Sequence, residues 1–292
     1  MKNVPIESSR RFGALPGASR AIAACWAALV LLTGAQAQNV AGTAAAGAAV
    51  PALPSLPNAP APHVRDTGAV TVRNTPRHVL EDQKAIWTSP ARVRAHDLVW
   101  LLPIAAATGV ALATDAHTMR SVVSHDPQFN HDATDAANSM LATLVAVPVW
   151  NFAYGEARNH PHAREAGILG GETLVDAGVL EQGIKLAFWR ERPHLDNSNG
   201  KFWQSSVGPD SSFPSSHTVF AWSTAAVIAG EYPSRWNQLT VYTLATGVSL
   251  TRVLGQEHFP TDVLVGSTVG WLAGHYIYKA RHRWHPRNDS SH

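Results

Sequence analysis

Two cations and a proline stand at spacings that suit the binding of an anion. Lys185 and Arg192 are seven residues apart, close to two helical turns, so both side chains would project from one helix face. Pro193 disfavours helix at Arg192 and places its guanidinium where a helix gives way to a loop. Arg190 is rotated away from Lys185 and is a weaker candidate. Taken alone, the pair also fits a solvated basic helix end.

A second stretch, Pro214 to Thr218, opens an apolar run that is typical of a helix. Ser215 is a good N-cap, and the N–H groups of the first turn, which includes Ser216, form an anion site. His217 lies in the same turn and could donate a proton to an oxygen of the bound anion. A capped helix with an incidental histidine is the plainer interpretation of this stretch alone.

The third stretch contains Arg252, His258 and Asp262. Pro260 indicates that a helix begins there, which puts Asp262 in its first turn and His258 just before it. Asp262 can then accept a hydrogen bond from one ring nitrogen of His258 and leave the other nitrogen without a proton. A surface His–Asp pair is the alternative.

Together the three stretches supply what phosphoryl transfer needs. Positive charge neutralises the phosphoryl oxygens, while positioning and electrostatics supply most of the catalysis. His258 must be neutral to attack, whereas His217 must be cationic to protonate the leaving oxygen. The combination predicts a phosphatase.

The three stretches resemble the motif of the PAP2 superfamily, which groups type 2 phosphatidic acid phosphatases, bacterial acid phosphatases and vanadium haloperoxidases. That motif reads K-x6-R-P, then P-S-G-H, then S-R-x5-H-x3-D, and the same order and spacing occur here within roughly Ala85 to Tyr278. The resemblance implies that His258 forms a phosphohistidine intermediate, Asp262 orients it and His217 is the acid. It also implies a set of phosphate-binding residues: Lys185, Arg192, Ser215, the Ser216 backbone and Arg252.

The chain departs from the motif at two positions. Thr251 replaces the usual serine and keeps its hydroxyl. Ser216 replaces the usual glycine, where a missing Cβ would let the backbone approach the phosphate closely. The added CH₂OH could crowd the anion or give it another hydrogen bond, and turnover and substrate choice depend on which.

These residues need helices to position them. Six segments are long for strands and lack alternating polarity, which predicts an all-α, six-helix PAP2-like bundle. The segments are Leu98–Thr114, Thr134–Tyr154, Ala166–Glu191, Ser215–Gly230, Asn237–Leu254 and Thr261–Arg281.

The first 37 residues have the basic head, short apolar stretch and Ala35-Gln36-Ala37 site of an export signal. Residues 38–80 are rich in Ala and Pro and are predicted to form a flexible, disordered linker. The phosphatase domain is expected over 81–282 and a polar tail over 283–292. The one cysteine, Cys25, lies in the signal, so cleavage would leave no thiol for disulfides or catalysis.

Acidic residues bear on where the protein resides. Glu172 and Asp176 fall on nearly the opposite helix face from Glu181 and Lys185, and acids are costly inside a membrane. This pattern favours an exported, periplasmic protein, soluble or membrane-associated, over an integral membrane protein. Four tryptophans near helix ends indicate either a membrane interface or a core: Trp100, Trp150, Trp189 and Trp236.

The sequence thus predicts a metal-independent phosphatase for phosphomonoesters or lipid (di)phosphates, without metal or cofactor, although vanadate could bind as a phosphate mimic. A formal net charge of only +2 gives no reason to expect nucleic acid, and contact with a membrane surface is possible. A vanadate-dependent haloperoxidase and a non-catalytic phospholipid binder are the alternatives. A histidine-rich metal protein is a third, but no stretch has a metal-ligand spacing such as H-E-x-x-H; its candidates are His125, His131, His160, His162, His282 and His285.

Overall fold

The computed structural model describes residues 70–204 and 210–283, and these residues form helices and loops without a strand. The predicted all-α fold is therefore confirmed. The predicted signal, most of the linker and most of the tail lie outside the described residues. Within the described part there are seven α-helices: α2 (Thr75–Thr88), α3 (Leu98–Ser121), α4 (Pro127–Arg158), α5 (Pro161–Phe188), α6 (Ser216–Glu231), α7 (Arg235–Leu254) and α8 (Pro260–Arg281).

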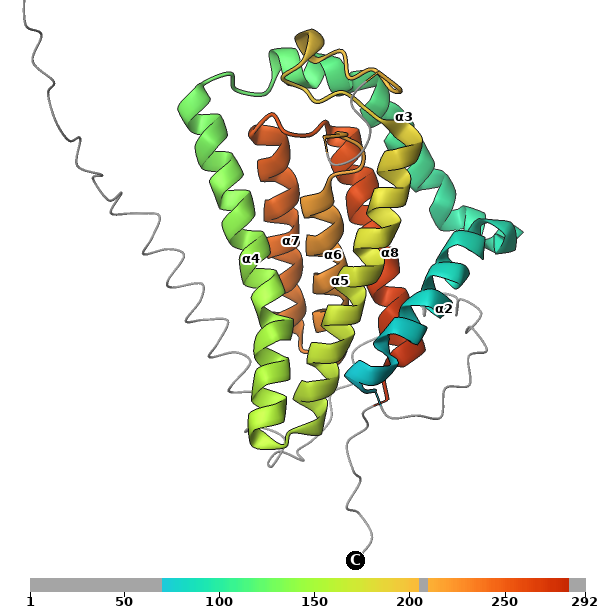
Figure 1. Ribbon diagram of the computed structural model, residues 1–292. Coiled ribbons are helices and arrows are strands. Elements are labelled where there is room, and N and C mark those ends of the chain that lie inside the picture. The colour runs from blue at the N-terminus through green and yellow to red at the C-terminus, as the bar shows by residue number, and fades with distance from the viewer. Residues whose placement is uncertain (1–69, 205–209, 284–292) are drawn as a thin grey trace, which may run out of the picture. The chain divides into compact units, whose positions relative to one another are not determined.

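Helix α6 is the centre of the bundle (Figure 1) and packs against α4, α5, α7 and α8. Most of its residues are small or β-branched, and most are buried, which lets four neighbours approach it. Helix α3 packs mainly on α8, and α2 packs on α5. The loops that follow α5 and α7, and the starts of α6 and α8, therefore come together at one end of the bundle.

Two glycines of α8 bring α6 and α8 into backbone contact. A Cβ at Gly270 would overlap the carbonyl oxygen of Val219, and one at Gly274 would overlap that of Ser223. Only a residue without a side chain fits between helices at this separation. The contact fixes the first turn of α6 beside the first turn of α8, so it sets the geometry of the two stretches that carry the predicted histidines.

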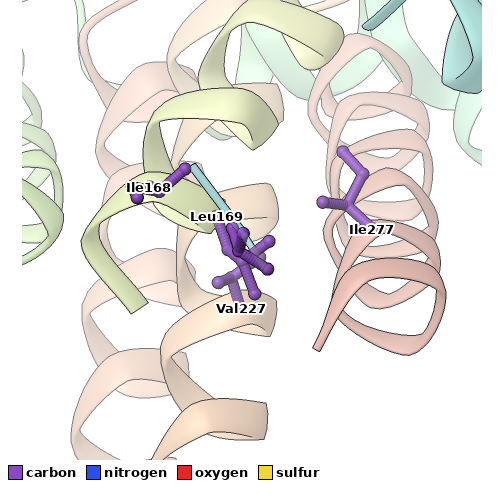
Figure 2. Close-up of a cluster of buried hydrophobic side chains, with 5 residues drawn as sticks. Ile168, Leu169, Val227 and Ile277 are labelled. Carbon is purple, nitrogen blue, oxygen red and sulfur yellow. The ribbon is translucent and has the colours of Figure 1, made fainter. Parts of the chain in front are cut away.

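Apolar side chains from α5, α6 and α8 fill the space between these helices at the other end (Figure 2). Ile168 and Leu169 of α5 meet Val227 of α6 and Ile277 of α8, and Val70 joins them. Full burial of such a side chain stabilises the fold by roughly 1.5–3 kcal/mol. The cluster holds together three helices that each have one end at the predicted site.

Helix α2 was not predicted, and the predicted linker extends to residue 80 although α2 begins at Thr75. The buried residues of α2 are polar, so the sequence shows no apolar stripe there. His78 Nδ1 lies 2.9 Å from Glu172 Oε1. Asp82 forms an ion pair of 2.8 Å with Arg281 of α8. Helix α2 is thus held by charged and hydrogen-bonded pairs whose partners are far away in sequence.

The acids of α5 are buried inside the protein, which removes the argument drawn from them against contact with lipid. Glu172 faces α2, and Asp176 Oδ1 accepts a hydrogen bond of 2.8 Å from Gln83 of that helix. Both side chains are buried. Val175 and Val179 of the same helix are exposed. The helix therefore presents apolar side chains outward although it contains several charges.

Asp176 supplies a prediction about pH. Burial raises its pKa to about 7, and the nearby carboxylates of Asp82 and Glu172 act in the same direction. The folded protein thus keeps this proton up to about pH 7, while an unfolded chain releases it above its ordinary pKa of 3.8. The stability that the protonated carboxyl contributes is present at low pH and is lost as the pH rises from about 4 to 7, by as much as about 4 kcal/mol.

Asp176→Asn, which imitates the protonated form, should therefore raise the melting temperature by clearly more at pH 8 than at pH 5. Thermal unfolding at both pH values measures this, with the exposed Asp135→Asn as a matched control. An equal loss of stability at both pH values would show that Asp176 is ionised in the folded protein.

The outward faces of the described helices are unusually apolar. Two helical segments, Ala95–Ser121 and Pro127–Arg158, are long and apolar enough to cross a membrane, and none of the most apolar window of the first is buried. Trp100, Trp150 and Trp236 are exposed, so they are not core residues.

Candidate active site

Helix α5 ends at Phe188, three residues before the predicted end. Trp189 adopts a left-handed conformation with φ of 32°, which stops the helix before Arg192. Arg192 therefore belongs to the following loop, where its Nε donates to the carbonyl oxygen of Asp210 at 3.2 Å. Lys185 stays on the last turns of α5 and is buried. The predicted common helix face is wrong, but the loop returns Arg192 to the same end of the bundle.

Arg192 and Arg252 meet at one carboxylate, that of Glu257. Arg192 Nη1 lies 2.7 Å from Glu257 Oε2, and Arg252 Nη2 lies 3.4 Å from the same oxygen. Two guanidinium groups that share one anionic oxygen form a site for a compact anion. In this structure the carboxylate of Glu257 supplies that anion, and the two predicted phosphate-binding arginines are thus brought together.

Lys185 and Ser216 meet at a second carboxylate, that of Glu181. Lys185 Nζ lies 3.1 Å from Glu181 Oε1, and Ser216 Oγ donates to the same oxygen at 2.5 Å. Burial lowers the pKa of Lys185, and the charge of Glu181 opposes that effect. The hydroxyl that replaces the usual glycine at Ser216 is thus directed to Glu181.

His258 is oriented by a backbone carbonyl, not by Asp262 as predicted. Its Nδ1 lies 2.7 Å from the carbonyl oxygen of Ser212, whereas Asp262 Oδ2 is 3.8 Å away, beyond hydrogen-bond distance. A carbonyl oxygen can only accept, so Nδ1 carries the proton and Nε2 keeps its lone pair. Burial lowers the pKa of the imidazole, which favours this neutral form. The predicted nucleophilic tautomer is therefore present, held by a different group.

Asp262 holds the surroundings of His258 in place. Its Oδ1 accepts from Arg190 at 2.6 Å, and its Oδ2 accepts from Ser212 Oγ at 2.5 Å and from the Phe259 backbone at 2.9 Å. Ser212 is the residue whose carbonyl orients His258. Asp262 thus acts on the nucleophile through Ser212.

Arg190, the weaker candidate for binding phosphate, is buried and connects α3 with α8. Its guanidinium pairs with Asp262 of α8 and, at 2.7 Å, with Asp115 of α3. It also lies over the rings of Phe202 and Phe259. With both carboxylates and both rings around it, Arg190 supports the site and is not available to bind a phosphate.

His217 lies on the first turn of α6, where Nε2 is 2.8 Å from Asn138 Oδ1 of α4. Its pKa is lowered to about 4 by burial first, and then by repulsion from Arg252, from His258 when that ring is protonated, and from Arg192 and Lys185. His217 is therefore neutral near pH 7 when no anion is bound. The same effects show that the five predicted cationic and imidazole groups share one site.

Ser215 occupies the N-cap position, but its side chain does not cap the helix. Its Oγ instead accepts from Thr218 Oγ1 at 3.0 Å, and its backbone N–H donates to the carbonyl oxygen of Asp262 at 3.2 Å. The first turn of α6 is thus tied directly to the first turn of α8. The N–H groups of that turn have no helical partner and suit an anion.

The site contains groups that sequence reasoning missed. These groups belong to none of the three motifs, and the fold brings them to the site: Asp115, Asn138, Ser212 and Glu257. Only Glu257 offered a signal, because it directly precedes His258 in a stretch already singled out. Combined with the predicted residues, they form a buried neutral imidazole next to a cationic anion site, an arrangement that can transfer a phosphoryl group.

Glu257 should compete with a bound phosphate for the two arginines. Glu257→Gln removes the competing charge, so we expect the KM of a phosphate substrate and the Ki of inorganic phosphate to fall by about three- to tenfold, the effect of roughly 1 kcal/mol. Steady-state kinetics measures both constants, with Glu156→Gln on the exposed face of α4 as control. A rise in both constants would instead assign Glu257 to holding the arginines in position.

Comparisons with known proteins agree with the motifs. The chain is 27% identical over 151 residues to lipid A 1-phosphatase of Porphyromonas gingivalis, covering 51% of this chain and 31% of that protein. It is 39% identical over 72 residues to phosphatidylglycerophosphatase B of Escherichia coli K12, covering 24% of this chain and 28% of that protein. The chain thus spans about a third or less of the length of these curated relatives.

A solved structure is described as the first transmembrane PAP2 type phosphatidylglycerolphosphate phosphatase from Bacillus subtilis. It aligns with 70% of this chain and 94% of its own, with 19% identity and a TM-score of 0.40. The family model of the PAP2 superfamily matches residues 167–286, which include all three stretches and every residue of the predicted site. The motifs and this match agree, so residues 167–286 are similar to the PAP2 superfamily in both spacing and overall sequence.

Proposed function

We propose that the protein is a phosphatase that hydrolyses lipid phosphates through a phosphohistidine on His258, without a metal ion. One observation carries the proposal: a buried histidine holds its proton on Nδ1 and shares an anion site with two arginines and a lysine. An imidazole in this state is a nucleophile, and the cations supply the charge stabilisation that a metal ion gives other phosphatases.

The reaction takes two steps. Nε2 of His258 attacks phosphorus, a P–N bond forms, and the bond to the leaving oxygen breaks as that oxygen takes a proton from His217. A water molecule then attacks the phosphohistidine and gives its proton to His217, which releases phosphate and restores His258. Arg192, Arg252 and the N-terminus of α6 bind the phosphoryl oxygens through both steps.

This sequence requires His217 to gain a proton when substrate binds. Its pKa of about 4 results from burial and from neighbouring cations. A phosphate group carries up to two negative charges, so its binding beside the same cations offsets their effect and raises the pKa of His217. Binding of the anionic substrate therefore favours the protonated form of His217, which is the acid that hydrolysis needs.

The surroundings of the site support a lipid substrate. Phe188 and Trp203 are exposed beside the loop that carries Arg190 and Arg192, and their rings lie 6.3 Å apart. The apolar outward face of α3 extends from the same end of the bundle, where Arg120 donates to the carbonyl oxygen of Asn197. We place these surfaces against a bilayer, from which a phosphorylated lipid reaches the arginines. The two curated relatives are named as phosphatases of lipid A and of phosphatidylglycerophosphate.

Phosphate release from the full-length chain in detergent tests the function. We expect hydrolysis of phosphatidylglycerophosphate or a lipid A 1-phosphate to exceed that of p-nitrophenyl phosphate, and all of it to persist in EDTA. Loss of activity in EDTA would refute the metal-free mechanism. Phosphate binding without release would support a non-catalytic binder, and bromination with vanadate and peroxide would support a haloperoxidase.

His217→Ala should separate substrates by their leaving groups. Nitrophenolate leaves without a proton, whereas a lipid alkoxide needs one, so we expect about 10²–10⁴-fold loss on a lipid phosphate and a much smaller loss on p-nitrophenyl phosphate. Turnover numbers on both substrates measure this. Equal losses on the two substrates would contradict the acid role and assign His217 to binding alone.

A further inference from the structure

A second group of metal-binding side chains lies at the end of the bundle opposite the site. Glu165 is near the start of α5, Glu231 is the last residue of α6, and His282 directly follows α8. Each of these helices has its other end at the phosphate site. Glu165 and Lys185 are twenty residues apart on α5, about 30 Å at 1.5 Å per residue. The group is therefore separate from the catalytic machinery.

The donor atoms of these three residues converge. One donor atom from each lies within 4.8 Å of the other two. His282 Nδ1 is 2.8 Å from Glu231 Oε1 and 3.4 Å from Glu165 Oε1. Ligands bound to one zinc ion at about 2.0–2.1 Å in a tetrahedron are about 3.3 Å apart. Displacements of a few tenths of an ångström would bring His282 and the carboxylates to that spacing.

Other groups already fix the orientation of these ligands. His162 Nε2 lies 3.1 Å from the other oxygen of Glu231, and the backbone N–H of Arg283 donates to Glu165 Oε1 at 2.5 Å. Tyr278 packs against the ring of His282 at 4.9 Å. Metal ligands are commonly held in this way by a second set of hydrogen bonds. The side chain of Glu231 is completely buried and that of Glu165 is 12% exposed.

The charges are also compatible with a cation, although His162 and His282 already pair with Glu231. Two carboxylates in a largely buried group repel each other unless positive charge lies between them. His282 stands between both, and an imidazole together with carboxylate oxygens is a donor set that suits Zn²⁺. The apolar side chains of Figure 2 lie about one turn further in, because Leu169, Val227 and Ile277 precede or follow the three ligands by four or five residues. This apolar layer separates the three ligands from the rest of the bundle.

The geometry points to a zinc site formed by Glu165, Glu231 and His282, with His162 holding Glu231 and a fourth position left to water. The ion would join the ends of α5, α6 and α8 and stabilise the bundle without taking part in phosphoryl transfer. The site is independent of the proposed function, because none of its residues belongs to the phosphate site.

Calorimetric titration of the full-length, chelator-treated chain with ZnCl₂ tests the site. We expect one saturable Zn²⁺ per chain and a higher melting temperature with Zn²⁺ than with Mg²⁺. His282→Gln and Glu165→Gln should each weaken binding by at least about tenfold. Glu165→Gln is included because Glu165 lies at the rim, where a substitution is least able to disturb folding.

Two matched controls identify binding elsewhere. His131→Gln removes an exposed histidine of α4, and His285→Gln removes one from the tail beyond the described residues. Both should bind Zn²⁺ like the unmodified chain. Absence of saturable binding, unchanged affinity in His282→Gln, or loss of binding in His285→Gln would each overturn the assignment. None of these measurements depends on phosphatase activity.

Discussion

His258→Ala should reduce phosphate release by at least about 1,000-fold on every substrate, including those with good leaving groups. Alanine removes the nitrogen that we propose forms the P–N bond, and the cations that remain can bind the substrate but cannot replace the nucleophile. The buried ring of His258 contacts Ser212, so the variant also tests whether the site tolerates the space left behind. The turnover number on p-nitrophenyl phosphate measures the loss.

Trapping the intermediate makes this prediction specific. Rapid quenching in base of the unmodified protein with ³²P-labelled substrate should leave label that is stable to base and released by acid, as expected for a phosphohistidine, and His258→Ala should carry none. His275→Ala, an exposed histidine stacked on Trp271, is the matched control and should retain both label and turnover. Label that persists in His258→Ala would place the nucleophile elsewhere.

Arg190→Met should destabilise the protein by about 3–5 kcal/mol, the usual effect of leaving buried carboxylates without their cation. Methionine fills much of the same volume and can still contact Phe202 and Phe259, so lost charge would account for most of the change. Asp262 would lose its partner, and with it the support of Ser212 and His258. We therefore expect kcat to fall while KM changes less. Thermal unfolding and steady-state kinetics on the same preparation measure both effects.

A second substitution separates charge from shape in this prediction. Asp115→Asn added to Arg190→Met removes one of the two unpaired carboxylates, so it should restore part of the lost stability. Arg158→Met, at the exposed end of α4, should behave like the unmodified protein. Wild-type stability in Arg190→Met would mean that the carboxylates around it are neutral in the folded protein.

The sequence allowed the fold class, six helices and the principal site residues to be predicted, because each depends on local information. The helices are long apolar runs between breakers, and Lys185, His217 and His258 stand in motifs whose spacing is visible along the chain. The predicted end of α5 was wrong because Trp189 is left-handed and the following loop returns to the helix end, where the N–H of Trp203 donates to the carbonyl oxygen of Phe188 at 3.2 Å. Helix ends are in any case the least certain part of such predictions.

What could not be predicted depends on contacts between distant segments. The carbonyl of Ser212 orients His258 because the loop before α6 passes beside the loop before α8, and no pattern in either segment reveals that. The buried face of helix α2 cannot be recognised from the sequence, because its residues His78 and Asp82 are polar and pair with α5 and α8. Glu165 and His282 could not be predicted as neighbours either, because they are far apart in sequence and meet only in the folded chain.

The glycine contact between α6 and α8 also affects how the protein would respond to its surroundings. The N–H groups at the start of α6 and the segment that carries His258 are parts of one backbone-packed pair, so they are displaced together. Helix α3 lies outside this pair and reaches the site through Asp115, which pairs with Arg190 and accepts from the backbone N–H of Thr261. If the protein lies against a bilayer, as we propose, a change in lipid composition should alter substrate entry more than the distance between the start of α6 and His258.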